Sequence, residues 1–530
     1  MDDAITRHTD LAATLEAVTG KGSVSTDPAR RALFSQDVWA KGETALAVVR
    51  PATQDAVAAL LPVLAREGLA AFPRGGGMSY TKGYTPDRPG VVVDLTALNR
   101  IVEINADDMY VRVEAGCTWD ALYRTLKPLG LRTPFWGPLS GLSSTIGGGL
   151  SQNNAFFGAG LYGPSVESVL SLTIALADGS LLKTGSAGAD GAHPFFRTYG
   201  PDLTGLFLSD CGALGFKTEA TLRLIPMPEH EAYGSYAFAD AASLTQAMSD
   251  VARANIASEV FGFDPGLARV RLKRASLAGD AKALAKVVTG QGNLLKGVAE
   301  GAKMALAGRS FVGEADYTLH IVVEGRSAAG VAQDFARAEA LALKAGARKI
   351  ENTIPKVIRA NPFTPLNNML GPEGERWVPV HGIVRHSDAK ACWEAIEAVF
   401  AARAEGFARH GVETGYLVTT LSTTGFLIEP VFLWPEALFA LHEEAVEKSW
   451  LDRLPRHGAN PEATAVVAEA RQAVVDVFTR FGGAHFQIGR SYPFAQTRSA
   501  PVRALLDSLK AQLDPHNIIN PGVLGLETKA

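Results

Sequence analysis

The apolar and polar positions between residues 46 and 75 follow two different periods. ALAVVRP is a short apolar run, rich in β-branched residues and stopped by proline, which predicts a strand. TQDAVAALLPVLAREG starts with a threonine cap and carries apolar residues at helical spacing up to a glycine, which predicts a helix. LAAFPRGGG predicts a second strand that ends in a glycine loop. The order predicts a βαβ unit with this loop at the carboxyl end of a strand, where open α/β structures bind ligands.

Strand-like patterns continue beyond the glycine loop. GVVVDLTAL, RIVEINADDMYVRVEAG and SVLSLTIALADGSLLKTG alternate or run apolar around Asn-Ala and Asp-Gly turns, and WDALYRTLKPLGL between them has helical spacing. We therefore expect a second α/β lobe between Val91 and Pro226.

From about Glu229 the pattern changes to longer, alanine-rich helical stretches such as AAGVAQDFARAEALALKAG. Strand-like runs such as YTLHIVVEG and GFLIEPVFLW lie between them, which predicts one further α+β domain. The tail SAPVRALLDSLKAQLDPHNIINPG predicts a helix closed by an Asp-Pro turn.

Composition limits the class of protein. With 530 residues, 47% of them hydrophobic and 20% charged, the chain is globular and long enough for two or more domains. A formal charge of -4 provides no basic footprint for nucleic acid. Cys117, Cys211 and Cys392 are widely spaced, which favours neither a disulfide framework nor a zinc site. The amino terminus lacks the pattern of a secretory signal and no apolar run could span a bilayer, so we expect a cytoplasmic protein.

Basic residues outnumber acidic ones between residues 269 and 309, where apolar residues recur at helical spacing. Two interpretations are open: a helix on a membrane surface, or a helix with a solvated cationic face, which is the simpler of the two.

Two glycine clusters carry the strongest functional signal. PRGGGMSYTKG covers residues 73–83 and GPLSGLSSTIGGGLSQNNAFFGAGLYG covers residues 137–163. Consecutive backbone N–H groups in such loops form a nest for anions, and hydroxyl groups add donors. Neither cluster has the lysine of a P-loop or the GxGxxG spacing of a dinucleotide fold. Two lobes that each offer such a loop suit a long ligand with two phosphates.

The motifs PRGGGMSY, STIGGGLSQNNAFFGAGLYGPSVESV, GPDLTGLFLSDCGALGFKTEATLRL and LDPHNIINPG resemble, in order and spacing, the signatures of FAD-binding flavoproteins of the vanillyl-alcohol oxidase type. The resemblance covers essentially the whole chain. It implies an α+β fold with a two-lobed FAD-binding domain of the PCMH type, formed by residues 1–228 and a returning segment at 482–530, and an α+β cap domain at 229–481.

The resemblance also implies a set of FAD-binding positions. These are the pyrophosphate loop (Pro73, Arg74, Gly75, Gly76, Gly77, Met78 and Ser79), its continuation toward the flavin (Pro138, Ser140, Ser144, Thr145, Gly147 and Gly148), positions near the ribityl and adenosine parts (Asn153, Gly158, Tyr162 and Gly163), backbone contacts to the flavin or the adenine end (Cys211, Gly215 and Phe216), and Asn520 on the dimethylbenzene or pyrimidine side.

Covalent attachment of FAD is not expected. Many relatives of the resembled type attach the flavin through a histidine in the first loop, where Met78 stands here, or through a cap histidine, where Glu373 to Glu375 stand. A thioether is no partner for an ordinary flavin linkage, and Cys117 reads as a packed small residue. We therefore expect non-covalent FAD and no metal.

Substrate groups depart from both patterns known in the resembled family. Members that oxidise 4-substituted phenols use a Tyr-Arg pair and an acid, where Phe486, Gln487 and Ser140 stand here. Members that oxidise 2-hydroxy acids carry an HxGDGN-type motif, which is absent; WVPVHGIVRH supplies other candidates.

Each candidate catalytic residue has two interpretations. His381 is either a general base or a core histidine, and Arg490 either anchors an anionic substrate or forms a structural ion pair. Tyr492 is either a proton-transferring hydroxyl near the flavin or a core residue. Glu429 interrupts an apolar strand and either faces solvent from an edge strand or points into a cavity with a raised pKa.

The resemblance, taken together with these candidates, implies an FAD-dependent oxidoreductase that removes a hydride from an alcohol carbon, with an aromatic or phenolic alcohol as the first candidate substrate. The alternatives are a lactate- or glycolate-type 2-hydroxy acid as substrate, and a redox-neutral flavoenzyme or a nucleotide-binding protein. The partners would be a small substrate and oxygen or an unidentified electron acceptor, and a homodimer is an open expectation.

Overall fold

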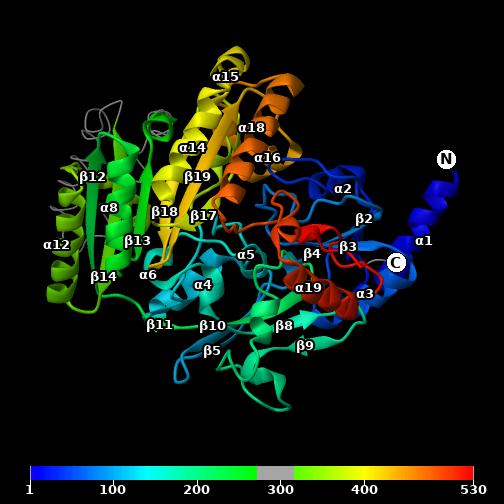
Figure 1. Cartoon of the computed structure of the whole chain (residues 1–530). Helices are drawn as coiled ribbons and strands as arrows, with labels where there is room; N and C mark the ends of the chain where they lie inside the picture. The colour runs from blue at the N-terminus through cyan, green and yellow to red at the C-terminus, as the bar shows by residue number, and fades with distance from the viewer. Residues whose placement is uncertain (1, 271–315, 529–530) are drawn as a thin grey trace. The chain divides into compact units, whose positions relative to one another are not determined.

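The computed structural model describes residues 2–270 and 316–528, which form two compact units. The first unit comprises Met1–Asn154, Ser165–Met227 and Phe486–Ala530, and the second comprises Ala155–Pro164 and Pro228–His485 (Figure 1). The sequence placed the divisions at 228/229 and 481/482, and it assigned residues 155–164 to the flavin domain.

The short segment 155–164 lies in the second unit because its backbone is bound there. It contains helix α6 (Ala159–Tyr162). The Gly160 N–H donates to the carbonyl oxygen of Ser258 at 2.9 Å, and the Gly158 N–H donates to a carboxylate oxygen of Glu259 at 2.8 Å. The expectation that Gly158, Tyr162 and Gly163 belong to the flavin domain is therefore corrected.

The first sheet of the first unit confirms the predicted βαβ unit. Its strand order is β1-β2-β4-β3, and its strands are β1 (Val24–Ser25), β2 (Ala47–Val49), β4 (Gly90–Asp94) and β3 (Ala70–Arg74). Helix α3 (Gln54–Arg66) connects β2 to β3, and the side chain of Thr53 caps it by accepting the Ala56 N–H. Both β2 and β3 pair in parallel with β4.

Strand β4 was expected in the second lobe and instead lies between β2 and β3. All its residues are buried, as is usual for a central parallel strand. The second sheet is antiparallel throughout, in the order β5-β6-β10-β8-β9. Its strands are β5 (Ile101–Asn105), β6 (Tyr110–Glu114), β10 (Phe216–Arg223), β8 (Val169–Ala175) and β9 (Leu181–Lys183).

Helix α3 forms the centre of the core of this unit. Its apolar residues, among them Val57 and Leu61, share one buried cluster with residues of both sheets and with Ile518 and Ile519 of the tail. The tail runs along the free edge of β3, where the Ala71 N–H donates to Ile518 at 2.7 Å. The implied return of the carboxyl-terminal segment to the amino-terminal domain is thus confirmed, as is the α+β fold class.

The remaining described helices of the first unit are α1 (Asp2–Thr19), α2 (Pro28–Phe34), α4 (Trp119–Leu126), α5 (Ile146–Gln152), α7 (Leu203–Leu206) and α19 (Ala500–Leu513). A two-stranded sheet pairs β7 (Leu131–Arg132) with β11 (Ile225–Pro226). Helices α4 and α19 confirm the helices expected from WDALYRTL and from the tail.

The second unit is built on an eight-stranded sheet in the order β15-β12-β14-β13-β18-β19-β16, with β17 also paired to β19. Its strands are β12 (His230–Phe238), β13 (Glu259–Phe263), β14 (Tyr317–Gly325), β15 (Arg348–Lys349), β16 (Arg376–Pro379), β17 (Gly382–Arg385), β18 (Glu413–Leu421) and β19 (Gly425–Trp434).

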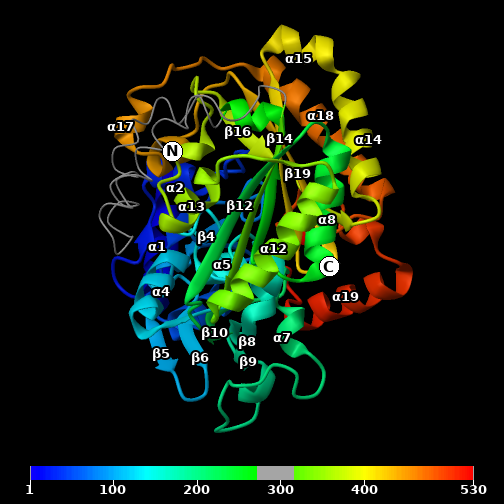
Figure 2. The ribbon, with the colours of Figure 1, turned by 90° about the vertical axis from the view of Figure 1, so that its left-hand side faces the viewer.

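Helices cover this sheet. Figures 1 and 2 show α8 and α12 side by side along the strands at one end, and α14 and α18 follow beyond them. The helices are α8 (Ala241–Ala254), α12 (Ala328–Lys344), α13 (Thr353–Ala360), α14 (Ala389–Ala401), α15 (Ala404–His410), α16 (Ala440–Ala445), α17 (Lys448–Leu451) and α18 (Pro461–Arg480). The expected mixture of alanine-rich helices and strands is confirmed here.

In the part of the chain that the structure describes, no helix is both long and apolar enough to pass through a bilayer. Residues 271–309 of the basic segment expected at 269–309 lie outside the described residues. The interpretations of that segment stay predictions.

Candidate functional site

The two glycine clusters meet in the first unit. A side chain at Gly75 would collide with the hydroxyl oxygen of Thr145, and one at Gly76 would collide with the carbonyl oxygen of Ser143. Gly77 has a φ of 75° and lies directly beside the guanidinium of Arg74. The glycines in the first loop are therefore needed for close approach to the second loop and for a left-handed backbone.

The loop that follows β3 carries a run of available backbone donors. No acceptor within residues 2–270 and 316–528 takes the N–H groups of Gly75, Gly76, Gly77, Met78 or Ser79. Buried or half-buried N–H groups are costly unless a partner satisfies them. Successive N–H groups in such a loop form a nest for an anion.

The second cluster contributes less directly than expected. The N–H of Gly147 donates to the carbonyl oxygen of Ala115 at 2.8 Å, and the N–H of Gly148 donates to the hydroxyl of Thr145 at 3.3 Å. The amino-terminal donors of α5 at these positions are thus used inside the protein. Thr145 caps the helix, and its loop closes one side of the nest.

The serines of the second cluster bond to each other. The hydroxyl oxygens of Ser140 and Ser144 lie 2.6 Å apart and share one hydrogen bond, and the carbonyl oxygen of Pro138 accepts the N–H of Gly141 at 2.9 Å. This turn is therefore rigid. It presents serine hydroxyls and no carboxylate at Ser140 and Ser144.

Arg74 brings a positive charge to the nest. Its side chain is buried, with the guanidinium carbon 4.0 Å from the ring centre of Phe34 and 5.5 Å from that of Tyr84. Its Nε has no hydrogen-bond partner among the described residues, and no carboxylate forms an ion pair with it there. A buried guanidinium without a counter-ion is unfavourable, so this geometry fits an anionic ligand.

Tyr84 is hydrogen-bonded to the first glycine loop. Its hydroxyl donates hydrogen bonds toward the carbonyl oxygens of Gly77 at 2.9 Å and Gln36 at 2.8 Å. Burial raises the pKa of Tyr84, so the phenol stays neutral and keeps its proton for these carbonyls. Sequence reasoning missed Tyr84 and Phe34: only the tertiary contact with Arg74 identifies them.

Asn153 offers a second unsatisfied group at the end of α5. It adopts a left-handed conformation with a φ of 53°, and its side-chain oxygen is buried without a partner in the described part of the chain. A ligand donor would satisfy this oxygen. Among the positions expected near the ribityl and adenosine parts, Asn153 is the one that the first unit contains.

Asn520, which was expected to face the flavin, binds other parts of the first unit through its amide. Its amide nitrogen donates to the carbonyl oxygens of Gly83 and Cys211, both at 2.8 Å, and its amide oxygen accepts from Arg490 at 3.2 Å. Both amide donors are used by the protein. Asn520 therefore ties the end of the first glycine loop to the tail and does not present a free amide to a flavin.

The contacts of Arg490 favour the interpretation that it forms a structural ion pair. Its guanidinium donates to the carbonyl oxygens of Lys82 at 2.7 Å and Pro521 at 2.6 Å, and its Nε lies 3.4 Å from Asp87. Because these partners occupy the fork, we no longer expect Arg490 to anchor a substrate.

The positions expected to contact flavin through their backbone are structural as well. The Cys211 N–H donates to Ser151 at 2.9 Å, and burial raises the pKa of the Cys211 thiol to about 12. Gly215 lies against the side chain of Ile174, and Phe216 is in the buried core. These residues support the site through backbone hydrogen bonding and core packing.

His381 and Glu429, two of the catalytic candidates, lie in the second unit. His381 is fully buried after β16; burial, with the charges of His485 and Arg471, holds the pKa of His381 well below its ordinary value. Its backbone carbonyl oxygen is hydrogen-bonded to the ring nitrogen Nδ1 of His485 at 2.8 Å.

Glu429 is buried on β19, which has a strand on either side, so the interpretation that Glu429 faces solvent from an edge strand is wrong. Tyr492 is buried in the first unit, and its role stays a prediction.

A cluster that the sequence did not reveal lies on three strands of the second unit. Arg359 on α13 forms ion pairs with Glu231, Glu259 and Glu324, and Tyr233 donates to Glu231. Glu259 is also the acceptor for Gly158, so the cluster fixes the segment 155–164.

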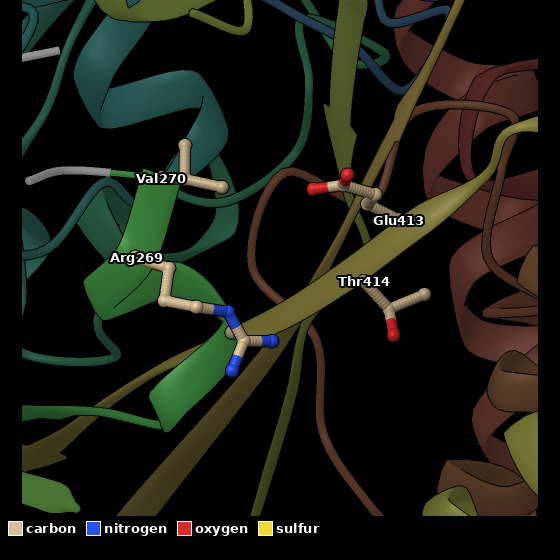
Figure 3. A pocket seen from close by; sticks show the side chains of 5 residues that line it. Arg269, Val270, Glu413 and Thr414 are labelled. Carbon is tan, nitrogen blue, oxygen red and sulfur yellow. The ribbon is translucent and has the colours of Figure 1, made fainter. Parts of the chain in front are cut away.

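One surface pocket of about 380 Å³ lies in the second unit. Figure 3 shows Arg269 and Val270 on one wall and Glu413 and Thr414 on β18 opposite. The chain enters its undescribed stretch directly after Val270, so this pocket carries no assignment. No group of three or more His, Cys, Asp or Glu side chains in the described ranges could hold a metal ion.

Comparisons with known proteins agree with this geometry. Residues 45–185 match the family described as FAD binding domain. The glycolate oxidase subunit GlcD of Bacillus subtilis (strain 168) is 28% identical over 248 residues, which cover 47% of this chain and 51% of that protein. The mitochondrial D-lactate dehydrogenase (cytochrome) of Kluyveromyces lactis is 31% identical over 179 residues, which cover 33% of this chain and 30% of that protein.

The similarity therefore spans about half the length of the first relative and less of the second. A crystal structure of p-cresol methylhydroxylase with substrate bound has a TM-score of 0.71 to this chain at 17% identity, and covers 99% of this chain and 98% of its own. Residues 45–185, which contain both glycine loops, thus match an FAD-binding domain, and the whole chain shares the fold of p-cresol methylhydroxylase.

Proposed function

We propose that the protein is an FAD-dependent oxidoreductase that oxidises a CH–OH carbon of a small molecule. The observation that carries the proposal is the nest of residues 75–79, in which unpartnered backbone N–H groups meet the buried Arg74 guanidinium. This donor set suits the diphosphate of FAD. When bound, FAD supplies the redox chemistry by accepting two electrons from the substrate.

The residues of the first unit would bind and orient the cofactor. The loop 75–79 and Arg74 would hold the diphosphate, and the Asn153 oxygen would accept a donor of the ribityl or adenosine part. Asn520, Arg490 and Cys211 would keep the loop in place through their hydrogen bonds. The catalytic base stays a proposal between His381 and Tyr492. His381 has a lowered pKa and would be neutral, as a base must be before it accepts a proton.

Among substrates, we place a small 2-hydroxy acid first. The support is that several relatives with sequence similarity are named for glycolate or D-lactate. This reverses the order suggested by the motifs alone. Chemically, the substrate would give up its C–H hydrogen with two electrons and its hydroxyl proton, leaving a 2-keto acid.

An aromatic alcohol or 4-substituted phenol is the second candidate, favoured by the fold shared with p-cresol methylhydroxylase. At 17% identity this likeness concerns the fold, and one fold supports many reactions. The acid expected for a phenol substrate is also missing: Ser140 stands at its position, and the hydroxyl of Ser140 is hydrogen-bonded to that of Ser144.

Anaerobic reduction of the purified flavoprotein tests the proposal. Glycolate and both enantiomers of lactate form one panel, and vanillyl alcohol and 4-alkylphenols form the other. Loss of the flavin absorbance with one hydroxy acid enantiomer is the expected result, and bleaching by the phenols alone would move the second candidate to first place. If no compound of either panel reduces the FAD-loaded protein, the proposal fails and the redox-neutral alternative is favoured. Repeating the productive reaction in air separates oxygen from another electron acceptor.

A further inference from the structure

Large apolar side chains are exposed together on one loop of the first unit. Between β9 and α7, the exposed fractions are 58% for Phe195, 53% for Phe196 and 74% for Tyr199, and Leu203 follows at 45%. Elsewhere in the described chain, large exposed apolar residues occur singly or in pairs. Isolated exposed residues need no explanation, but a group of aromatic rings on one loop does.

The loop is a fixed structure and not a slack connection. The Ser186 N–H donates to the carbonyl oxygen of Phe196 at 2.8 Å, and the Ser186 hydroxyl donates to that of His193 at 2.6 Å. Arg197 donates to the carbonyl oxygen of Val166 at 3.0 Å and pairs with Asp202 at 2.9 Å. The backbone thus holds the rings outward at an energetic cost in water.

The ribbon places this loop beyond the edge of the antiparallel sheet. Figures 1 and 2 both show the chain after β9 leaving the strands as a teal-to-green excursion at the lower edge of the first unit. Strand β9 is the edge strand of that sheet, so the loop projects past the edge of the sheet.

The size and charge of the tip favour a lipid bilayer over a protein as its binding partner. At these exposures the three rings present on the order of 400 Å². That is about half of what each partner of a standard protein interface contributes, so the tip alone is too small for a stable dimer. A protein partner would need a pocket complementary to these rings, whereas lipid adapts to their shape. Aromatic side chains also favour the interfacial region of a bilayer.

Charge plays a small part at the tip. Arg197, its basic residue, is paired with Asp202, and Asp190 is the other acidic residue of the segment. With one arginine against two aspartates, the segment is not attracted to anionic lipid, so apolar contact must supply the binding.

We propose that the loop 189–203 is a membrane-docking tip, which inserts Phe195, Phe196 and Tyr199 into the interfacial region of a lipid bilayer. The protein would then work at a membrane surface without crossing it. The inference concerns a surface separate from the FAD nest, and it holds whatever the substrate is.

Flotation of the FAD-loaded protein with phosphatidylcholine vesicles tests the tip. The variant Phe195→Ser/Phe196→Ser/Tyr199→Ser is compared with wild type and with Val502→Ser/Leu505→Ser, which removes exposed apolar residues from α19. We expect wild type and the α19 variant to float, and the triple variant to lose binding by about tenfold or more. Unchanged flavin content in all three shows that the fold is intact.

A fluorescent label at the tip gives an independent readout. The described native cysteines are all buried, so Tyr199→Cys can be labelled with a polarity-sensitive dye. A blue shift of the dye with phosphatidylcholine vesicles is expected.

Four results would overturn the proposal. The wild type could fail to float, the triple variant could float as well as wild type, or both could bind vesicles only when phosphatidylserine is added. Self-association of wild type without lipid, lost in the triple variant, would instead assign the tip to a second copy of the chain and would equally overturn it.

Discussion

At the scale of single residues, the site depends on the absence of side chains in the first glycine loop. Gly76 lies against the carbonyl oxygen of Ser143, and backbone oxygen atoms cannot swing away as a flexible side chain can. The close approach brings the two loops together around the nest. The conformation of residues 75–79 is therefore set by packing before any ligand binds.

Gly76→Ala should separate the two loops. We expect the purified protein to lose most of its flavin and about 1–3 kcal/mol of stability, the usual cost of overpacking. The ratio of flavin to protein absorbance and the thermal unfolding midpoint measure the two effects. Gly458→Ala is the matched control, because a methyl group there would meet no atom within 4 Å. Normal flavin content in Gly76→Ala would contradict the assignment of the loop.

Arg74 provides the charge of the nest, and its replacement should weaken binding selectively. Arg74→Gln removes a charge-assisted contact of about 1.5–3 kcal/mol, so the Kd for FAD should rise roughly tenfold to a hundredfold. Titration of the apoprotein with FAD, followed by fluorescence quenching, gives this value. Riboflavin lacks phosphate, so any binding of riboflavin should be unchanged.

Arg124→Gln is the control for Arg74→Gln. Arg124 is exposed and pairs with Asp120 within α4, so FAD affinity should stay at the wild-type value. An equal loss of affinity for FAD and riboflavin in Arg74→Gln would show that the residue supports the fold and not the phosphate.

At the scale of elements, the tail is fixed to the site by a buried lysine. The Lys510 ammonium on α19 donates to Asp514 at 2.6 Å and to the carbonyl oxygens of Ala213 and Ile519 at 2.9 and 2.8 Å. These bonds join α19, the loop after Cys211 and the segment that pairs with β3. The tail can thus position Asn520 only while this junction is intact.

Lys510→Met should detach the tail. Removing one partner of a buried ion pair costs about 3–5 kcal/mol, and here two carbonyl groups also lose a donor. We expect faster hydrogen exchange in the tail and in β3, with weaker FAD retention. Lys390→Met, which alters an exposed pair with Glu394, should leave both unchanged.

The Arg359 cluster gives the second unit a pH dependence. The groups that face Arg359 are Glu231, Tyr233, Glu259 and Glu324. Burial raises the pKa of Glu259 above its ordinary value, so the folded state binds more protons than the unfolded state. The stability linked to this proton is present below the unfolded pKa and is lost as the pH rises through the folded value.

Arg359→Met removes the counter-ion and should enlarge this pH dependence. We expect faster hydrogen exchange in β13 and β14 than in wild type, with a larger difference at about pH 8 than at about pH 5.5. Arg385→Met, which alters an exposed pair with Asp388, is the control. A destabilisation independent of pH would mean that Arg359 acts through packing alone.

Local signals in the sequence predicted the elements well, and pairing between distant segments less well. The Thr53 cap and helical spacing were enough for α3, and the glycine loop was placed correctly after β3. The apolar sequence of β4 is compatible with either lobe, because its pairing with β2 and β3 depends on contacts between segments that are distant in the sequence. Likewise, no local pattern shows that Arg490 and Asn520 bind each other, or that Glu259 holds the segment around Gly158.

At the scale of the whole molecule, the chemistry depends on how FAD is retained. Met78 gives the first glycine loop no nucleophilic nitrogen for a flavin linkage. A cysteinyl linkage would need a thiolate, yet burial raises the pKa of Cys117 to about 11 and the pKa values of Cys211 and Cys392 to about 12. In the non-covalent binding that we propose, retention comes from the nest, the Arg74 charge and the packing of the loops, all of which unfolding destroys.

Denaturation should therefore release the flavin. After acid precipitation we expect the yellow colour in the supernatant, with the absorbance of free FAD, and no fluorescent protein band on a denaturing gel. Met78→His provides the internal comparison, because it restores a nucleophilic nitrogen to the loop. A fluorescent band in Met78→His alone would show that this position reaches the flavin and that wild type lacks the linkage for want of the histidine. Colour that stays in the wild-type pellet would contradict non-covalent binding and would require an attachment point outside this loop.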